Sequence, residues 1–228
     1  MLKNKIISQA NIIFFAKILL AMTSIVIILA SYFGANNLML IARGLIIPIL
    51  AFLYYFSVKS KSKLYLIALL FVAISNIMFF YNTYNLILIG LLTFLLFRIL
   101  ILIQVYNLPE KVYFKPFFLG FLILSIPISY LFYVTTEHLG IIFYVGFITI
   151  QINALIGGIS ISNHQNFDGV SHTSLLISSM FFAILSVVFI IQKFFIHIPI
   201  NETIRVLLIL IAHYFYYLFL LQREREIK

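Results

Sequence analysis

Long apolar runs alternate with short polar links along the whole chain. Each run holds about 20 residues, which is enough, at about 1.5 Å per residue, for a helix to cross a hydrocarbon core of ~30 Å. The pattern predicts eight such helices, at roughly 11–33, 37–58, 64–81, 84–106, 115–135, 138–160, 174–193 and 202–221. Links such as GANN, SKSK and YNTYN are too short to hold a soluble domain. We therefore expect an all-α fold, in which residues 1–228 form a single membrane domain of eight transmembrane helices.

Composition supports an integral membrane protein and excludes several kinds of chemistry. The chain has 228 residues, of which 64% are hydrophobic and only 9% are charged, so a soluble domain is excluded. It has no cysteine, which excludes disulfides, thiol catalysis and thiolate metal sites. The basic, apolar N-terminus is similar to a signal peptide, but its apolar part is too long and contains Lys17. We expect a retained first helix.

The basic residues predict the orientation of the helices. The formal net charge is +9, and Lys17, Arg43 and Arg98 lie farther inside predicted spans than the other basic residues. With eight spans, most of the others fall on the side of both chain ends; they are Lys3, Lys5, Lys59, Lys61, Lys63, Lys111, Lys115, Arg223, Arg225 and Lys228. Lys193 and Arg205 fall on the opposite side. Because Lys and Arg favour cytoplasmic loops, we expect both termini in the cytoplasm, membrane lipids as partners and no nucleic acid.

Arg98 is the most deeply placed charge. Lys17 and Arg43 lie within about two turns of a helix end and could reach an interface, whereas Arg98 is about eight residues, or ~12 Å, from the end of its span. The acidic residues lie in links or near span ends; they are Glu110, Glu137, Asp168, Glu202, Glu224 and Glu226. Arg98 must therefore be met by amides, hydroxyls, carbonyls, water or an anionic ligand such as a phosphate.

Among the neutral polar residues within the spans, four are candidates for a binding role. Asn76 in the third span and Ser186 in the seventh could each hydrogen-bond to a neighbouring helix. Gln151 and Asn153, near the middle of the sixth span, could do the same or line a cavity. These side chains therefore have both a packing role and a binding role open to them.

The histidines do not predict a metal site. HQNFDGVSH places His164, Asp168 and His172 at four-residue steps, but we interpret this stretch as a Gly-containing polar loop rather than a helix. His138 begins the sixth span and His213 lies within the eighth, where each could belong to a pocket or to an interface. We expect neither a metal nor another cofactor.

Four stretches resemble the YhhN-like lysoplasmalogenase family of eight-helix membrane proteins. ALLFVAISNIMFF and the following GLLTFLLFRILILIQVY are similar to its third and fourth helices, SSMFFAILSVVFIIQKF to its seventh, and ARGLIIPILAFLY to its second. The matching residues are Gly90, Phe94, Phe182, Lys193 and Phe194. The polar positions depart from the family: Asn76 and Ser186 replace its two aspartates and Arg98 its histidine, while Arg43 is only loosely placed at its lysine.

The resemblance implies a lipid-binding pocket with altered chemistry. The family hydrolyses the vinyl ether bond of lysoplasmalogens, which requires a proton donor and a group that guides water. Neither an amide, a lone hydroxyl nor a guanidinium replaces an aspartate in these tasks. We therefore expect a pocket between the third, fourth and seventh helices, lined by Asn76, Arg98 and Ser186.

The expected function is binding or processing of lysophospholipids, with the hydrolase activity weakened or lost. Arg98, Arg43 and His213 are the candidates for binding the substrate. Two alternatives stay open: an active hydrolase in which His213 or His138 transfers the proton, and a transporter or membrane scaffold. A helical bundle of this kind is typical of a bacterial inner membrane, because outer membranes carry barrels.

Overall fold

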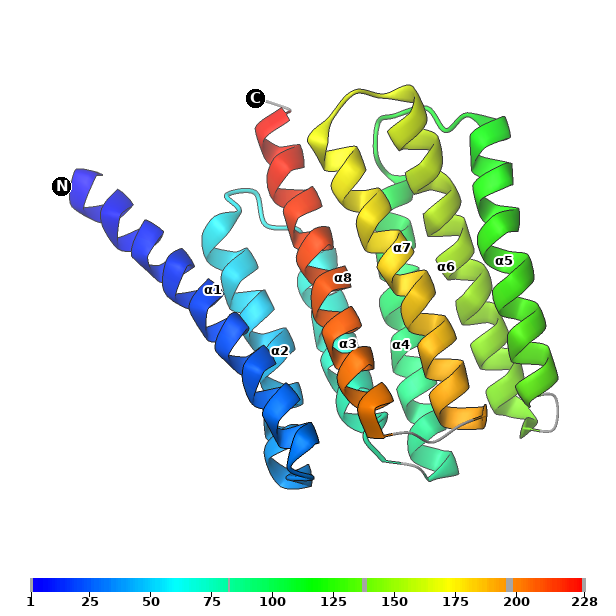
Figure 1. Cartoon of the computed structure of the whole chain (residues 1–228). Helices are drawn as coiled ribbons and strands as arrows, with labels where there is room; N and C mark the ends of the chain where they lie inside the picture. The colour runs from blue at the N-terminus through cyan, green and yellow to red at the C-terminus, as the bar shows by residue number, and fades with distance from the viewer. Residues whose placement is uncertain (1, 82, 137–138, 196–198, 227–228) are drawn as a thin grey trace.

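Long helices, each antiparallel to the next along the chain, form one bundle (Figure 1). The structure is a computed structural model that describes residues 2–81, 83–136, 139–195 and 199–226. Its helices are α1 (Leu2–Tyr32), α2 (Asn36–Ser57), α3 (Lys63–Met78), α4 (Tyr84–Tyr106), α5 (Phe114–Thr136), α6 (Ile141–Asn166), α7 (Val170–Ile190), the π-helical turn η2 (Ile191–Phe195) and α8 (Pro199–Glu226). Because α1 begins and α8 ends at the top of Figure 1, we call this the upper end.

The described residues confirm an all-α fold with eight α-helices, but one helix is shorter than predicted. Seven helices are long and apolar enough to cross a membrane. The eighth, α3, has 16 residues and is ~24 Å long. It ends before residue 81 because Phe80 and Tyr81 donate backbone hydrogen bonds to the carbonyls of Ile77 and Met78, at 3.1 and 3.2 Å, which form a tight turn.

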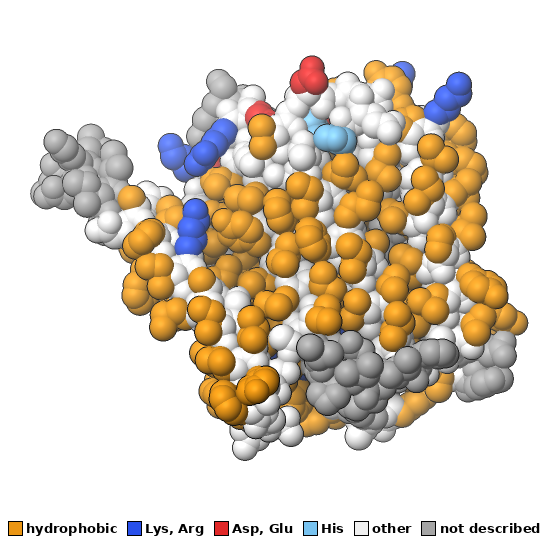
Figure 2. Space-filling view, in the orientation of Figure 1, with side chains coloured by type: hydrophobic (Ala, Val, Ile, Leu, Met, Phe, Trp, Pro, Cys, Tyr) orange, Lys and Arg blue, Asp and Glu red, His pale blue; other side chains and the backbone are white. Residues whose placement is uncertain are grey.

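The surface is that of a membrane protein. Apolar side chains cover most of the face in Figure 2, and the Lys, Arg, Asp and Glu side chains seen there lie mainly toward the upper end. Large aromatic side chains such as Phe14, Phe114 and Tyr130 are at least two-thirds exposed. In water this surface would aggregate, whereas lipid tails solvate it. The chain is therefore an integral membrane protein.

The stretch HQNFDGVSH is mostly helical, and the prediction of a polar loop there was wrong. α6 continues through Asn166, whose side-chain amide donates to the Ser162 carbonyl at 2.7 Å, and α7 begins at Val170. His164 thus lies in the last turn of α6 and His172 in the first turn of α7. Among the described residues there is no group of three acidic or histidine side chains placed to hold a metal.

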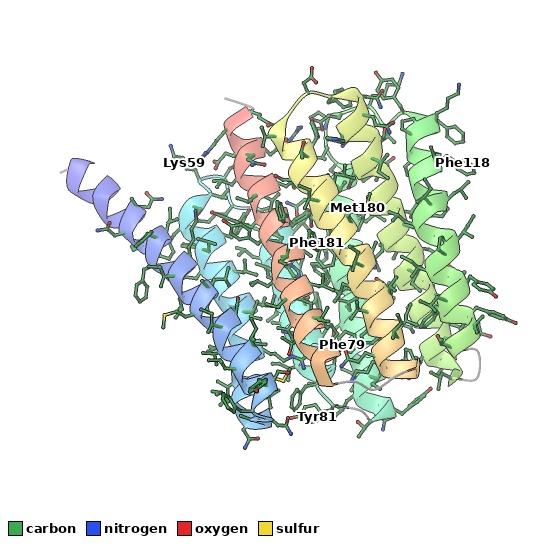
Figure 3. The ribbon with its side chains drawn as sticks, in the orientation of Figure 1. Lys59, Phe79, Tyr81, Phe118, Met180 and Phe181 are labelled. Atoms are coloured by element: carbon green, nitrogen blue, oxygen red, sulfur yellow. The ribbon has the colours of Figure 1, made fainter. Side chains whose placement is uncertain are left out.

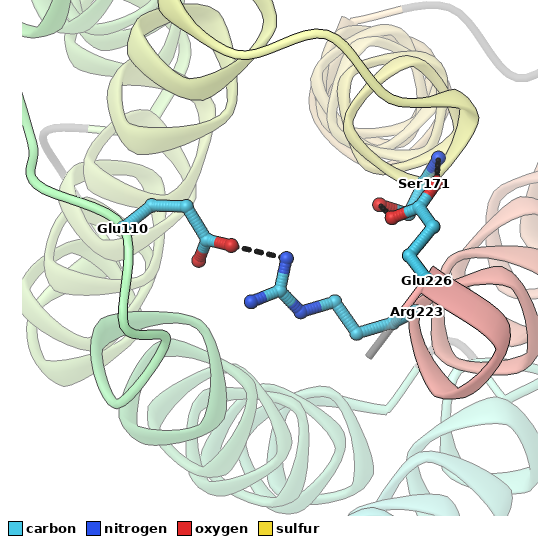
Figure 4. A network of polar contacts seen from close by, with 4 residues as sticks. All are labelled: Glu110, Ser171, Arg223 and Glu226. Atoms are coloured by element: carbon cyan, nitrogen blue, oxygen red, sulfur yellow. Dashed lines mark hydrogen bonds and ion pairs between the residues drawn. The ribbon is translucent and has the colours of Figure 1, made fainter. Parts of the chain in front are cut away.

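The end of α8 is tied to three other parts of the upper end. Arg223 forms an ion pair with Glu110, which lies in the α4–α5 link, and Glu226 accepts hydrogen bonds from Ser171 at the start of α7 (Figure 4). Glu224 accepts hydrogen bonds from the backbone N–H groups of Lys59 and Ser60 in the α2–α3 link, at 2.9 and 2.8 Å. These contacts hold the links in place and neutralise charges at the membrane surface.

Glycines bring α5 and α6 into close contact. A Cβ atom on Gly158 of α6 would lie 2.7 Å from the backbone oxygen of Phe117 on α5. A Cβ atom on Gly120 of α5 would lie 3.3 Å from the Cα atom of Gly158. Small residues at such positions let helix backbones approach closely in lipid.

We expect Gly158→Ala to destabilise the protein by about 1–3 kcal/mol, because the added methyl group forces the α5 backbone away. Gly44→Ala is the matched control, since a Cβ atom at Gly44 meets nothing within 4 Å. The control should be neutral or stabilising by up to ~1 kcal/mol, because alanine favours a helix over glycine. Thermal unfolding in detergent measures both variants, and equal effects would contradict the close packing.

Candidate functional site

A narrow cavity of about 50 Å³ lies between the lower halves of α3, α4, α6, α7 and α8. Its polar lining residues are Ser75, Asn76, Thr149, Ser186 and Arg205, and its aromatic ones are Phe79, Phe94, Phe132 and Phe189. Figure 3 shows Phe79 beside the lower end of α8. Phe132 reaches the cavity from α5 because Gly146 leaves room for its ring: a Cβ atom there would lie 2.3 Å from the ring. The cavity is thus mainly apolar, with a few polar groups.

Asn76 is fixed in the cavity wall by Arg43. The side-chain amide of Asn76 donates to the Arg43 carbonyl at 3.1 Å, and the Arg43 guanidinium donates to the Asn76 carbonyl at 3.4 Å. Both side chains are buried, and the pair joins α2 to α3. The side-chain oxygen of Asn76 has no hydrogen-bond partner among the described residues. A hydrogen-bond donor from a ligand could satisfy it, because a buried acceptor without a partner is costly.

Ser186 is the end of a hydrogen-bond chain that crosses three helices. Arg98 of α4 donates from its Nε to the side-chain oxygen of Asn153 on α6. The Asn153 amide donates to the Ser186 hydroxyl at 3.2 Å, which donates in turn to the Phe182 carbonyl at 3.0 Å. The Arg98 guanidinium also lies 3.9 Å from the centre of the Phe182 ring, where a cation is stabilised by the π face.

The structure brings two of the three predicted pocket residues to one cavity. Asn76 and Ser186 line it, whereas Arg98 is absent from its wall and lies behind Ser186, with Asn153 between them. The placement of Arg98 in the pocket wall therefore needs correction. The side-chain oxygen of Asn153 accepts the hydrogen bond of the Arg98 guanidinium instead. Both residues lie near the middle of their spans, so this contact is possible.

Arg205 is the cavity residue that sequence reasoning missed. It lies near the start of α8, is only 1% exposed, and donates to the Phe79 carbonyl at 3.3 Å. Its guanidinium carbon is 5.8 Å from the ring centre of Phe189. One signal was available: Arg205, Ile209 and His213 follow at steps of four and so share one face of the helix.

The remaining predicted binding residues lie outside the cavity wall. Arg43 is fully buried within the bundle, where it bonds to Asn76. His213 is also fully buried, with its ring centre 5.1 Å from those of Phe97 and Phe182. Neither of its ring nitrogens has a hydrogen-bond partner in the described part of the chain, so it is not bonded to Asn76 or Ser186. His138 lies outside the described residues.

A π-helical turn closes the lower end beside the cavity. η2 follows directly after Ile190, which lines the cavity, and such turns are frequent at functional sites. Within η2, the Lys193 ammonium donates to the carbonyl of Tyr81, in the α3–α4 link, at 3.5 Å (Figure 3). The turn therefore connects the end of α7 to the end of α3, the two helices that carry Ser186 and Asn76.

The cavity lining offers binding groups but no titratable acid. It contains an amide, hydroxyls and a guanidinium, and no Asp or Glu from the described residues. The described carboxylates lie in the upper-end links or at the end of α8; they are Glu110, Asp168, Glu224 and Glu226. The side chains of Glu137 and Glu202 lie outside the described residues. These lining groups can hold an anion and hydroxyl groups, but they do not deliver protons near neutral pH.

No protein-family model, no curated protein and no solved structure matches this chain. The resemblance to lysoplasmalogenases therefore stays a prediction from the quoted segments.

We expect Asn153→Leu to destabilise the protein by about 3–5 kcal/mol, because it leaves the buried Arg98 guanidinium without its hydrogen-bond partner. The double variant Arg98→Met/Asn153→Leu should recover most of this loss, since it removes the charge as well. Thr93→Val on α4 is the control, because the Thr93 hydroxyl bonds to carbonyls of its own helix. Unfolding curves in detergent measure the four proteins. A double variant no more stable than Asn153→Leu would contradict the pairing.

Proposed function

We propose that this integral membrane protein binds a lysophospholipid in the lower cavity, and that the vinyl-ether hydrolase activity of the resembled family is weakened or lost. The observation that carries the proposal is the lining: apolar aromatic walls, with Asn76, Ser186 and Arg205 as polar groups. A mainly apolar site with a few placed polar groups is the usual form of a small-molecule pocket. An amphipathic lipid is the ligand that such a mixture suits in a membrane.

The polar groups match the head of a single-chain phospholipid. The guanidinium of Arg205 lies toward the lower end and can pair with a phosphate, the anion that its planar fork recognises. The unpartnered side-chain oxygen of Asn76 can accept a hydrogen bond from the free glycerol hydroxyl of a lysolipid. A diacyl lipid has no such hydroxyl, so this contact favours the single-chain form.

The walls match one acyl chain. The cavity is narrow, and the rings of Phe79, Phe94, Phe132 and Phe189 line it. An extended chain of methylene groups needs more room than the cavity's 50 Å³, so we propose that these rings move apart to admit one chain. Burial of each methylene contributes about 0.8 kcal/mol, so even a partly buried chain supports binding.

The loss of activity follows from the same residues. Protonation of a vinyl ether requires an acid, and at the two positions where the resembled family has aspartates the chain has Asn76 and Ser186. His213, the alternative proton donor, makes no hydrogen bond to either residue. The cavity therefore favours binding over turnover.

We further propose that both termini are cytoplasmic, that α3 completes an eight-span topology despite its length, and that the protein resides in a bacterial inner membrane. The basic residues of the α2–α3 and α4–α5 links and of the end of α8 all lie at the upper end, and basic residues favour the cytoplasmic side. The cavity then lies in the half of the membrane that faces away from the cytoplasm.

Lysophospholipid should raise the melting temperature of the purified protein more than a diacyl lipid with the same headgroup does. At a lipid concentration of 100 times Kd, binding to the folded state stabilises the protein by ~2.7 kcal/mol. For a chain of this size, this stabilisation raises the melting temperature by roughly 5–10 °C. Asn76→Ala and Arg205→Gln should lose most of this shift, each measured against its own lipid-free value. Ser24→Ala is the control, because the Ser24 hydroxyl bonds within α1, which does not line the cavity. Equal shifts from both lipids would contradict single-chain recognition.

The purified protein should release little or no aldehyde from lysoplasmalogen, beside a lysoplasmalogenase that works under the same conditions. The reason is that the described residues of the cavity lining include no acid. Fast turnover would contradict the loss of activity. It would not decide whether the cavity binds lysophospholipid, which the melting temperature tests separately.

A further inference from the structure

A second hollow lies at the upper end of the bundle, away from the cavity. It is a groove between α4 and α5 with α6 as its floor, and its volume is about 700 Å³. Leu102 and Ile103 line it from α4, Phe117 from α5, and Leu155 and Ile159 from α6. These five side chains are apolar and belong to helices that are long and apolar enough to cross a membrane. The groove is therefore a feature of the membrane-embedded surface.

The groove follows from the close packing of α5 on α6. Because Gly158 and Gly120 bring these two helices together, α5 lies against α6 and leaves a gap toward α4. α6 packs against both neighbours and forms the floor of the gap. The same glycines that stabilise the α5–α6 pair thus create the space beside it.

The mouth of the groove is held in position. The α4–α5 link is anchored at Glu110, which pairs with Arg223 (Figure 4), and at Tyr113, whose N–H donates to the Ser162 hydroxyl of α6 at 2.8 Å. Between these anchors lies Lys111, and Lys115 follows in the first turn of α5. Both lysine side chains are exposed.

The mouth is also positively charged. Glu110 is the acidic residue next to Lys111, and its charge is neutralised by Arg223. Two exposed cations remain beside the groove in the sequence: Lys111 precedes Val112, and Lys115 lies two residues before Phe117, both of which line the groove. An anionic phospholipid is complementary to this pattern, because it has a negative headgroup above apolar chains.

We propose that this groove is a binding site for an anionic diacyl phospholipid of the surrounding bilayer. One acyl chain lies along Leu102, Phe117 and Leu155, and the phosphate lies between Lys111 and Lys115. Basic residues next to an apolar membrane surface attract anionic headgroups, at about 1 kcal/mol for each Lys or Arg. A bilayer lipid suits the groove better than a peptide does, because most of the lining residues lie within membrane-spanning helices. The polar lining residues, Tyr106 and Asn107, lie at the end of α4, where a headgroup would sit. The site is independent of the function proposed for the lower cavity.

Phosphatidylglycerol and phosphatidylcholine with identical acyl chains test the site. The purified, delipidated full-length protein is titrated with each lipid in detergent, and bound lipid is counted by native mass spectrometry. We expect phosphatidylglycerol to bind about 10- to 30-fold more tightly, as two lysines near the headgroup imply. Added salt should reduce this ratio, because it screens exposed charges.

Two pairs of substitutions separate this site from general surface charge. Lys111→Gln/Lys115→Gln should bring the ratio of the two affinities close to one. Lys59→Gln/Lys63→Gln removes two exposed cations from the same end of the bundle, in and beside the α2–α3 link, and should leave the ratio unchanged. Leu155→Phe should weaken both lipids, because its larger ring fills the groove.

Three results would overturn the proposal. The first is equal binding of the two lipids by the parent protein. The second is an equal loss of preference in both lysine pairs, and the third is unchanged binding in Leu155→Phe. The melting temperature of each variant without lipid shows whether it is folded, so that a misfolded variant is not counted as a loss of the site.

Discussion

A guanidinium in the hydrocarbon core of a membrane costs about 2.5–3.5 kcal/mol on insertion scales, and it must be met by polar or aromatic groups of the protein. Arg43, Arg98 and Arg205 are among the largest fully buried side chains of this chain. Arg43 and Arg205 each donate to a backbone carbonyl at the end of α3, and Arg98 donates to the amide of Asn153. Each also lies near the face of at least one phenylalanine ring. Much of the interior is arranged around these cations.

The same contacts position the polar lining of the cavity. Arg43 orients Asn76, and Arg98 acts through Asn153 on Ser186, so two buried cations outside the cavity hold two of its polar residues. Arg205 supplies the charge of the cavity itself. At the upper end, three residues near the end of α8 hold other parts of the bundle: Arg223 the α4–α5 link, Glu224 the α2–α3 link and Glu226 the start of α7. The α4–α5 groove also lies at this end. In the described part of the chain, the interior thus contains arginines and neutral polar groups, whereas the carboxylates lie at the upper end.

The helices could be predicted from the sequence because an apolar run of membrane length leaves few other folds. The end of α3 could not, since the turn after Met78 depends on local hydrogen bonds within an apolar stretch. The HQNFDGVSH stretch was misread because its polar residues also suit the ends of two helices. Asn76 and Ser186 were grouped through the family resemblance, and the structure places both on one cavity.

The absence of Arg98 from the cavity wall could not be predicted, for a different reason, and the place of Arg205 was indicated only by the four-residue steps that it shares with Ile209 and His213. Which face of a helix turns inward depends on packing between helices, and a nearly uniform apolar sequence contains little information about that rotation. Arg205 also lies close to the edge of its predicted span. At such a position the sequence does not distinguish a basic residue that sets the orientation of the helix from a buried cation.

Photo-crosslinking tests the central claim, which is that the lower cavity holds a single-chain phospholipid. A lysophospholipid with a diazirine in its acyl chain is bound to the purified protein and irradiated, and the labelled residues are mapped by mass spectrometry. The account predicts labels on cavity residues such as Leu185, Phe189 and Ile209, which excess unlabelled lysophospholipid removes. Labels confined to lipid-exposed residues such as Phe14 and Tyr130, unaffected by the competitor, would contradict it.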